Sequence, residues 1–156
     1  MLFTNCLWVF FISMVPIVEL RGAIPVGYAL DIPLWLNLSL CVIGNFLPVP
    51  FILLFIRRIL SWMKTVKRLD KIAFWLERKA EKHSNKVMKG VASGLFLFVA
   101  IPLPGTGAWT GALVASLFNM RMKYALPAIL LGVIVAGVIM SLISYGLVGG
   151  ILDVFA

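Results

Sequence analysis

The hydrophobic positions of the chain form apolar runs of two lengths, separated by charged or proline-rich breaks. The first two runs, residues 7–18 and 22–30, are short and are separated by Glu19 and Arg21. A helix of 15 residues is about 22 Å long, whereas the hydrocarbon core of a bilayer is about 30 Å thick, so neither run crosses alone. The pattern predicts a re-entrant helical hairpin that turns near Pro16 to Glu19.

A longer apolar run follows the predicted hairpin. Residues 34–56 contain no charge over 23 positions, which is long enough for a helix that spans a bilayer. We expect this helix to be kinked, because three residues interrupt the apolar pattern: Asn45, Pro48 and Pro50.

The same order of runs returns in the second half of the chain. Two short runs, 91–101 and 108–118, flank a break rich in proline and glycine, and residues 124–149 form a second long run without a charge. The breaks at Pro16 and Pro102 are offset by 86 residues. Because each half contains one full crossing, two halves in tandem lie upside down relative to each other, as in many transporters.

These elements predict an all-α membrane protein with an inverted repeat. Each half is a re-entrant helical hairpin plus one full transmembrane helix, and a basic amphipathic cytoplasmic helix joins the halves. We expect a single membrane domain over residues 1–156. Repeat one covers residues 1–56, the connector covers 57–89, and repeat two covers 90–156. The alternative is four plain spanning helices.

The composition supports a membrane protein. Hydrophobic residues make up 62% of the chain, charged residues 13%, and the mean hydropathy is +1.07. Soluble domains contain about 45–50% apolar and about 25% charged residues, and a small soluble domain buries only a modest share of its surface. A bilayer removes the need to bury so much apolar surface inside the protein.

The net charge is concentrated in the segment 57–89. It contains eleven of the fourteen Lys and Arg residues and three of the six Asp and Glu residues, so it carries the whole net charge of +8. A basic stripe between two apolar blocks indicates a cytoplasmic segment, so nucleic acid is not an expected partner. Apolar residues at helical spacing predict an amphipathic helix at the anionic inner membrane surface, with a soluble helical hairpin as the alternative. They are Ile59, Trp62, Met63, Val66, Leu69, Ala73, Leu76 and Ala80.

Glu19 and Arg21 are the charges that interrupt the first hairpin. A charge in a membrane segment costs about 2.5–3.5 kcal/mol on insertion scales, so such residues usually face a cavity or each other. We interpret Arg21 as a site for an anionic headgroup, because its forked donors match phosphate, and Glu19 as a proton-exchanging group. The alternative is a structural ion pair or two residues that reach the interface, although residues i and i+2 do not face each other on a helix.

The break in the second half runs Pro102-Leu103-Pro104-Gly105-Thr106-Gly107-Ala108-Trp109. Prolines remove backbone donors and glycines let the chain turn, and exposed backbone at membrane depth needs cover from protein or water. A helix that starts near Thr106 would point unpaired N–H groups into that space, where they attract anions. The alternative is a turn with tight helix packing, since Gly107, Gly111 and Ala115 form a small-residue face. The two readings are compatible.

The remaining sequence offers one further polar candidate and no catalytic set. Asn45 lies in the middle of the first long run, beside Gly44, and is expected to hydrogen-bond a broken helix or the substrate, with the structural role favoured. No nucleophile–base set, phosphate loop or metal spacing is recognisable, and Cys6 and Cys41 are too few for a disulfide framework. We therefore expect a protein that is not an enzyme and has no cofactor or metal.

Two motifs resemble those of a known family: Glu19-Leu20-Arg21-Gly22-Ala23-Ile24-Pro25, and the run from Pro102 to Trp109. With them, nearly the whole chain resembles the small multi-drug export protein family, which looks like a distant relative of the DedA-type (SNARE-associated) superfamily. The family name implies drug export. The DedA-type resemblance implies instead that lipid phosphates such as undecaprenyl phosphate move between leaflets, through opposed re-entrant hairpins with acidic and arginine residues. This chain departs from that pattern, because only its first hairpin is charged.

The candidate substrate or proton site combines the two motifs with Asn45. It consists of Glu19, Arg21, Gly22, Pro25, Asn45, Pro102, Pro104, Gly105, Thr106, Gly107 and Trp109. We expect a multi-pass transporter or flippase of the cell membrane that moves an anionic amphiphile, with protons as a candidate coupling ion. A proton-coupled exporter of cationic drugs, with Glu19 as the cation site, is the second hypothesis, and a membrane scaffold without transport is the third. Expected partners are membrane lipids, the amphiphile and protons, and a second copy of the chain, because one protomer makes a thin wall around a cavity.

The charge distribution predicts the orientation in the membrane. With the segment 57–89 in the cytoplasm, both termini lie outside. In a variant whose only cysteine replaces His83, an impermeant thiol reagent added to intact cells should give no labelling, whereas a cysteine placed at Thr4 should react. Labelling at position 83, or protection at both ends of the chain, would contradict this topology.

Overall fold

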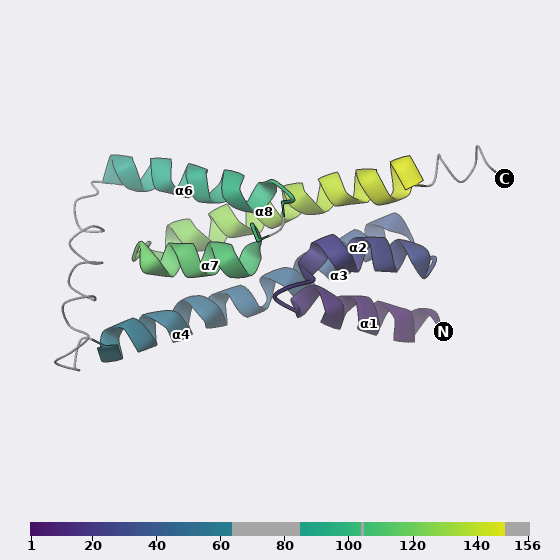
Figure 1. Ribbon diagram of the computed structural model, residues 1–156, viewed down its shortest axis with the longest axis horizontal. Helices are drawn as coiled ribbons and strands as arrows, with labels where there is room; N and C mark the ends of the chain where they lie inside the picture. Colours follow the sequence, from purple (N-terminus) through teal and green to yellow (C-terminus); the bar gives the residue numbers. More distant parts are fainter. Residues whose placement is uncertain (64–84, 104, 149–156) are drawn as a thin grey trace.

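The structure is a computed structural model that describes residues 1–63, 85–103 and 105–148 (Figure 1). All the secondary-structure elements in these residues are helical, as the sequence predicts. They are α1 Leu2–Met14, α2 Glu19–Ala29, α3 Leu34–Phe46, α4 Pro48–Met63, α6 Asn85–Ala100, α7 Ala108–Leu117, α8 Met122–Ser141 and the π-helix η1 Leu142–Val148.

Prolines set several of the helix ends. Val15 adopts an extended conformation after α1, as the residue before a proline prefers, and Pro33 precedes α3. Pro48 and Pro50 each lack a backbone donor, and the first long helix is interrupted at Leu47, between α3 and α4. The interruption lies where the sequence predicts a kink.

The turns after α2 and α7 use the same helix-capping motif. Asp31 and Asn119 follow the two helix ends in the left-handed conformation, with φ of 55° and 49°. The backbone N–H of the next residue, Ile32 or Met120, donates to the carbonyl five residues earlier, at 3.0 and 2.9 Å. This bond defines a Schellman cap. The two caps lie 88 residues apart, whereas the ends of α1 and α6 lie 86 residues apart, because the second break is longer.

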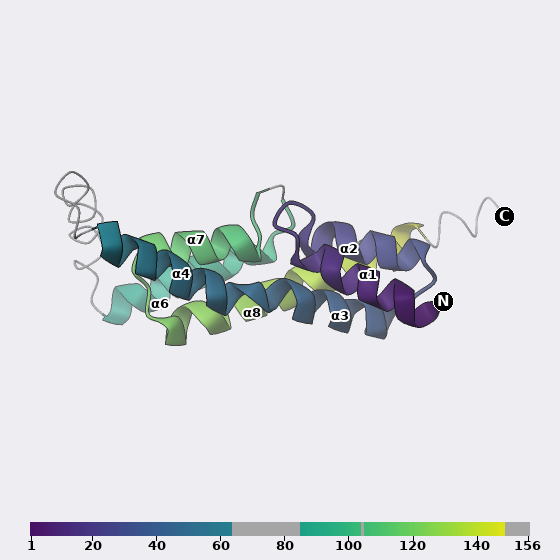
Figure 2. The ribbon, with the colours of Figure 1, turned by 90° about the horizontal axis from the view of Figure 1, so that it is seen from below.

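The two helical hairpins lie toward opposite ends of the molecule (Figures 1 and 2). The α1–α2 hairpin packs against α3, and α2 also contacts α8, near the end where the N-terminus lies. The α6–α7 hairpin packs against α8 and α4 toward the other end. The loop between α1 and α2 and the loop between α6 and α7 meet near the middle of the molecule (Figure 2). The arrangement therefore brings the two sequence breaks together.

Each capped turn is held by a side chain from the long helix of the other half. Arg57 of α4 donates to the carbonyl of Met120, beyond α7. Tyr145 of η1 donates its hydroxyl to the carbonyl of Ile32, beyond α2, at 2.7 Å. The two donors are 88 residues apart, and so are the two acceptors. The same clasp thus occurs twice, with the roles of the halves exchanged.

A buried polar cluster surrounds the clasp at Tyr145. The Asn37 amide, which is fully buried, donates to the Ile24 carbonyl at 2.9 Å and to the Tyr145 hydroxyl at 2.8 Å. The Cys41 thiol donates to the side-chain oxygen Oδ1 of Asn37 at 3.4 Å, and the Tyr28 ring packs edge-on against the Tyr145 ring. These contacts join α2, α3 and η1.

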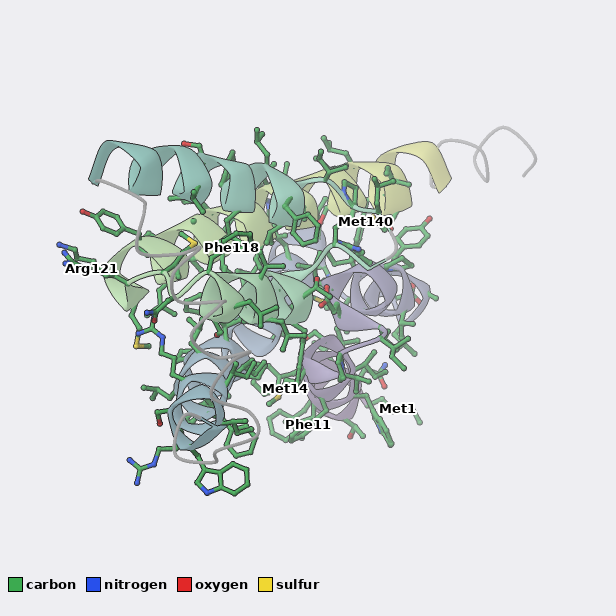
Figure 3. The ribbon with its side chains drawn as sticks, turned by 60° about the vertical axis from the view of Figure 1, so that its left-hand side comes forward. Met1, Phe11, Met14, Phe118, Arg121 and Met140 are labelled. Carbon is green, nitrogen blue, oxygen red and sulfur yellow. The ribbon has the colours of Figure 1, made fainter. Side chains whose placement is uncertain are left out.

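Two helical stretches are long and apolar enough to cross a bilayer, Leu34–Ile59 and Met122–Gly146, with 26 and 25 residues. Shorter apolar helices precede them. The exterior is also apolar: Trp35 is 78% exposed and Phe51 67%, and carbon-rich side chains such as Phe11 project outward (Figure 3). An exterior of this kind matches lipid better than water.

The basic connector differs in part from the predicted boundaries. Residues 57–63 continue α4, and residues 85–89 belong to α6, so these ends of the segment 57–89 extend the neighbouring helices. The predicted amphipathic helix between them falls on residues 64–84, outside the described residues. Arg121, which follows α7, lies toward the end opposite Met1 (Figure 3). The predicted orientation in the membrane stays a prediction.

The packing at Gly27 generates a test of the buried cluster. A Cβ atom there would collide with the Asn37 amide, so Gly27→Ala should lower the free energy of unfolding by about 1–3 kcal/mol, the usual cost of overpacking. Thermal unfolding in detergent measures the effect. Gly94→Ala is the matched control, because no heavy atom lies within 4 Å of its Cβ position. Equal unfolding temperatures for the two variants would contradict this account.

Candidate functional site

The two breaks enclose a cleft of about 640 Å³ near the middle of the molecule. The first break and the start of α2 supply one wall, the second break and α7 supply another, and Met140 of α8 completes the lining. The lining residues are Pro16, Ile17, Val18, Glu19, Arg21, Gly22, Pro102, Gly105, Gly107, Thr110 and Met140. Glu19 and Arg21 are the charged side chains among them.

Arg21 connects α2 to the second break. Its guanidinium donates to the carbonyls of Leu103 and Ile101, the second at 3.4 Å, and to the Thr106 hydroxyl at 3.0 Å. The Thr106 hydroxyl in turn lies 2.7 Å from the Ile101 carbonyl. The Ile101 carbonyl also accepts the Leu103 N–H at 2.8 Å, and the Leu103 carbonyl accepts the Thr106 N–H at 3.2 Å, so Arg21 adds a further donor to a turn that is already hydrogen-bonded. The same guanidinium lines the cleft, and its role as a site for an anionic headgroup stays a prediction.

Glu19 binds the N-terminus of α7. Its carboxylate Oε1 accepts the backbone N–H of Trp109 at 3.3 Å, and the side chain is only 5% exposed. Helix N-termini favour negative charge. The expectation that the helix begins near Thr106 and offers unpaired N–H groups to a ligand needs correction: α7 begins at Ala108, and the carboxylate of the protein itself takes that position.

The backbone at Glu19 is in a conformation that is unfavourable for a residue with a side chain. Its φ is 50°, in the left-handed region that glycine adopts most easily. A residue with a Cβ atom pays about 1–2 kcal/mol for that conformation. Glycine would remove this strain but also the carboxylate on α7. The geometry therefore identifies the carboxylate as the group for which the strain is tolerated.

Gly107 allows the close approach of Glu19 to α7. A Cβ atom on Gly107 would overlap the Glu19 carboxylate. The backbone N–H of Gly107 donates to the Thr110 hydroxyl at 2.8 Å. Gly111, one turn later, instead faces Val99 of α6. The predicted small-residue face thus contacts two different elements, with Gly107 at the charged site and Gly111 in helix packing.

Asn45 borders a narrow void beside the cleft. Neither polar atom of its amide has a hydrogen-bond partner, and the residue is 1% exposed. The void, which has no room for a water molecule, is lined by Asn45, Glu19, Leu20, Arg21, Val99, Gly107, Ala108, Val133 and Ala136. Leaving a buried donor or acceptor without a partner costs about 1–3 kcal/mol. The favoured structural role, a bond to a broken helix, is therefore absent in this conformation.

An apolar groove of about 820 Å³ lies along α4 on the other side of Trp109. Its walls include Met14, Phe51, Phe55 and Trp109, and Arg58 supplies its charge. The Trp109 ring is fixed by a hydrogen bond from Nε1 to the Met14 carbonyl at 3.1 Å. Trp109 thus contributes its ring to the groove and its backbone N–H to the Glu19 site.

The structure brings together most, but not all, of the predicted site. Gly22, Pro102 and Gly105 line the cleft with Glu19, Arg21 and Gly107, and Gly105 has the left-handed φ of 84° that only glycine adopts without strain. Pro25 lies inside α2 and is not among the residues that line the cleft, so its part in the site stays a prediction. Pro104 lies outside the described residues.

Sequence reasoning missed Arg57, Asn37 and Tyr145, which hold the two turns. The signal that pointed to Asn45, a polar residue within a long apolar run, was also present at Asn37 and Tyr145. In the part of the chain that the structure describes, no three His, Cys, Asp or Glu side chains come together as metal ligands.

The fold and the site define a helical membrane protein with a cleft near its middle that contains two charged side chains, Glu19 and Arg21. The family model for small multi-drug export proteins matches residues 19–139, well over half of the chain. The chain therefore belongs to the small multi-drug export protein family, whose name denotes membrane transporters. No curated protein and no solved structure matches it.

The contact between Gly107 and Glu19 gives a test of the site geometry. Gly107→Ala should push the carboxylate off the α7 N-terminus and lower the free energy of unfolding by about 1–3 kcal/mol. Gly90→Ala, whose Cβ position has no neighbour within 4 Å, should unfold at the wild-type temperature or slightly above it. Thermal unfolding of both variants in the same detergent measures the difference, and a wild-type temperature for Gly107→Ala would overturn the assigned contact.

Proposed function

We propose that this chain moves an anionic amphiphile across the cell membrane, of the class of polyprenyl phosphates such as undecaprenyl phosphate. The observation that carries the proposal is the Arg21 guanidinium on the wall of the cleft. Guanidinium donors match the oxygens of a phosphate, so Arg21 suits an anionic headgroup. The neighbouring apolar groove offers space for a hydrocarbon chain, and Arg58 adds a second positive charge there.

The proposal includes a particular arrangement in the membrane. Each hairpin is re-entrant, the halves form an inverted repeat, and the end of the molecule that contains Arg57 faces the cytoplasm. The opposite positions of the hairpins, the repeated Schellman caps and the exchanged clasps support this arrangement. The opposed hairpins, and the acidic residue and arginine of the first one, support the resemblance to the DedA-type superfamily, although the second break contains no charge.

The cleft residues divide the work of transport between them. Arg21 binds the headgroup by exchanging its present backbone acceptors, the Leu103 and Ile101 carbonyls, for phosphate oxygens. Gly105 in the second break has no side chain to restrict its backbone, so the break can change conformation when these hydrogen bonds are exchanged. Glu19 takes up and releases a proton, which couples transport to the proton gradient.

Export of cationic drugs is the second candidate function. The family name favours it, and the Glu19 carboxylate in the cleft offers a negative charge to a cation. Arg21 argues against it, because a positive charge in the same cleft repels a cation. The two functions therefore predict opposite responses to the loss of Arg21.

Transport in proteoliposomes distinguishes the two candidates. Arg21→Ala should reduce movement of a fluorescent polyprenyl phosphate at least tenfold, and Arg21→Lys should restore it only in part, because lysine provides a point charge rather than a fork. Glu19→Gln should fold normally and lose the dependence on a pH gradient. Arg121→Ala is the matched control, since Arg121 does not line the cleft.

Two results would contradict the proposed function. If Arg21→Ala is folded and moves the anionic lipid at the wild-type rate, Arg21 does not bind the headgroup. If the same variant instead exports a cationic dye faster than the wild type, export of cations becomes the better assignment.

A further inference from the structure

The Asn45 amide has an unused donor and an unused acceptor in the same void as the Glu19 carboxyl. The position of the amide is fixed by the packing of α3 against α1, because a Cβ atom on the preceding residue, Gly44, would collide with the Ser13 hydroxyl and the Phe10 carbonyl. The void has no room for a bridging water. The candidate partners of Asn45 are therefore the groups that line the void with it.

Glu19 has the chemistry that the free amide requires. Apart from Arg21, which is bound to the second break, the other residues around the void offer apolar side chains or no side chain. A protonated carboxyl group has one donor and one acceptor, and an amide has the same pair in the complementary arrangement. The O–H of the acid then donates to Oδ1 of Asn45, while Nδ2 donates to the carbonyl oxygen of the acid. A carboxylate lacks the O–H, so this pair of hydrogen bonds forms only when Glu19 is protonated.

We propose that Glu19 and Asn45 form a proton site, in which Glu19 has two resting positions. As a carboxylate, Glu19 stays on the N-terminus of α7, where the Trp109 N–H and the helix favour its negative charge. When it takes up a proton, it turns from α7 to Asn45 and forms the two hydrogen bonds of an acid–amide pair. The proton comes from the cleft, because Glu19 lines both the cleft and the void.

The surroundings contain few other groups that respond to pH. Arg21 on α2 is the charged neighbour of Glu19 around the void. On the helices packed against α2, Cys41 and Tyr145 belong to the Asn37 cluster, with Tyr28 of α2 itself. Cys6 of α1 and Lys123 and Tyr124 of α8 are the other titratable residues of these helices, and none of them lines the void. The residues of α7 and α8 that line the void are not titratable: Ala108, Val133 and Ala136.

The proton site has a consequence for transport that rests on the proposed function. When Glu19 turns to Asn45, the N-terminus of α7 loses its anion and becomes available to a headgroup beside Arg21. Binding of a phosphate group and uptake of one proton then favour each other, because both require Glu19 to leave α7. The chain would carry the anion and the proton together.

Infrared difference spectroscopy of the purified full chain between high and low pH tests the proton site without a ligand. Glu19→Gln identifies the carboxyl band of Glu19 by its loss. In Asn45→Leu the carboxyl band should move to higher frequency, because the acid has lost its hydrogen bonds to the Asn45 amide. Protonation of Glu19 in this variant should need at least a tenfold higher proton concentration. Ser141→Ala is the matched control. The Ser141 hydroxyl is also buried without a hydrogen-bond partner, but Ser141 does not line the void.

Stability separates a proton site from a structural role. Asn45→Leu removes an unpaired amide, so its unfolding temperature should equal or exceed that of the wild type. Asn45→Ala provides a smaller replacement if leucine does not fit. An unchanged Glu19 band in a folded variant would overturn the proposal, and so would failure of both variants to fold, because Asn45 would then have an essential structural partner.

Binding of farnesyl phosphate in detergent tests the coupling. The wild type should take up about one proton per molecule bound and bind more tightly as the pH falls, whereas Glu19→Gln should bind without dependence on pH. Asn45→Leu should bind at least tenfold more weakly at neutral pH. If the wild type does not bind the probe at any pH while the infrared shift occurs, the proposed function fails and the proton site stands. If binding occurs with no proton uptake, the coupling fails alone.

Discussion

Backbone groups that lose their helical partners inside a membrane must find other partners within the protein, and this constraint governs the centre of the molecule. The breaks after α1 and α6 interrupt helical hydrogen bonding near the middle of the molecule. Arg21 donates to carbonyls of the second break, and Glu19 accepts an N–H of α7. Arg21 and Glu19 form hydrogen bonds to different groups of the second hairpin. Both charges of α2 thus contribute to the contact between the hairpins, together with the hydrogen bond from the Trp109 ring to the Met14 carbonyl.

The sequence predicts the helical elements well, because the features that define them are local. Charges, prolines and uncharged runs locate the hairpins, the break before Pro48 and the two long helices within a few residues. The second long run ends differently from the prediction, in the π-helix that contains Tyr145. Its hydrogen bond to Ile32 spans 113 residues, and no local pattern indicates such a contact.

The candidate site was harder to predict than the helices. The charges and the glycine-rich run named most of the cleft, because charge in an apolar segment requires a polar environment. The partner of each group could not be predicted, since Glu19 and Arg21 bond to the other hairpin rather than to each other. The close approach of Gly107 to Glu19 and the isolation of the Asn45 amide depend on helix positions that spacing does not specify.

The exchanged clasps determine the order in which the chain can mature during its synthesis. The α2–α3 turn emerges from the ribosome early, but its clasp is Tyr145, close to the end of the last described helix. Arg57, by contrast, is already made when Met120 arrives. The second hairpin can therefore dock on a finished partner, whereas the turn after the first hairpin acquires its clasp only after Tyr145 has been made. Quality-control factors that recognise unassembled membrane segments would have their longest opportunity at α1 and α2.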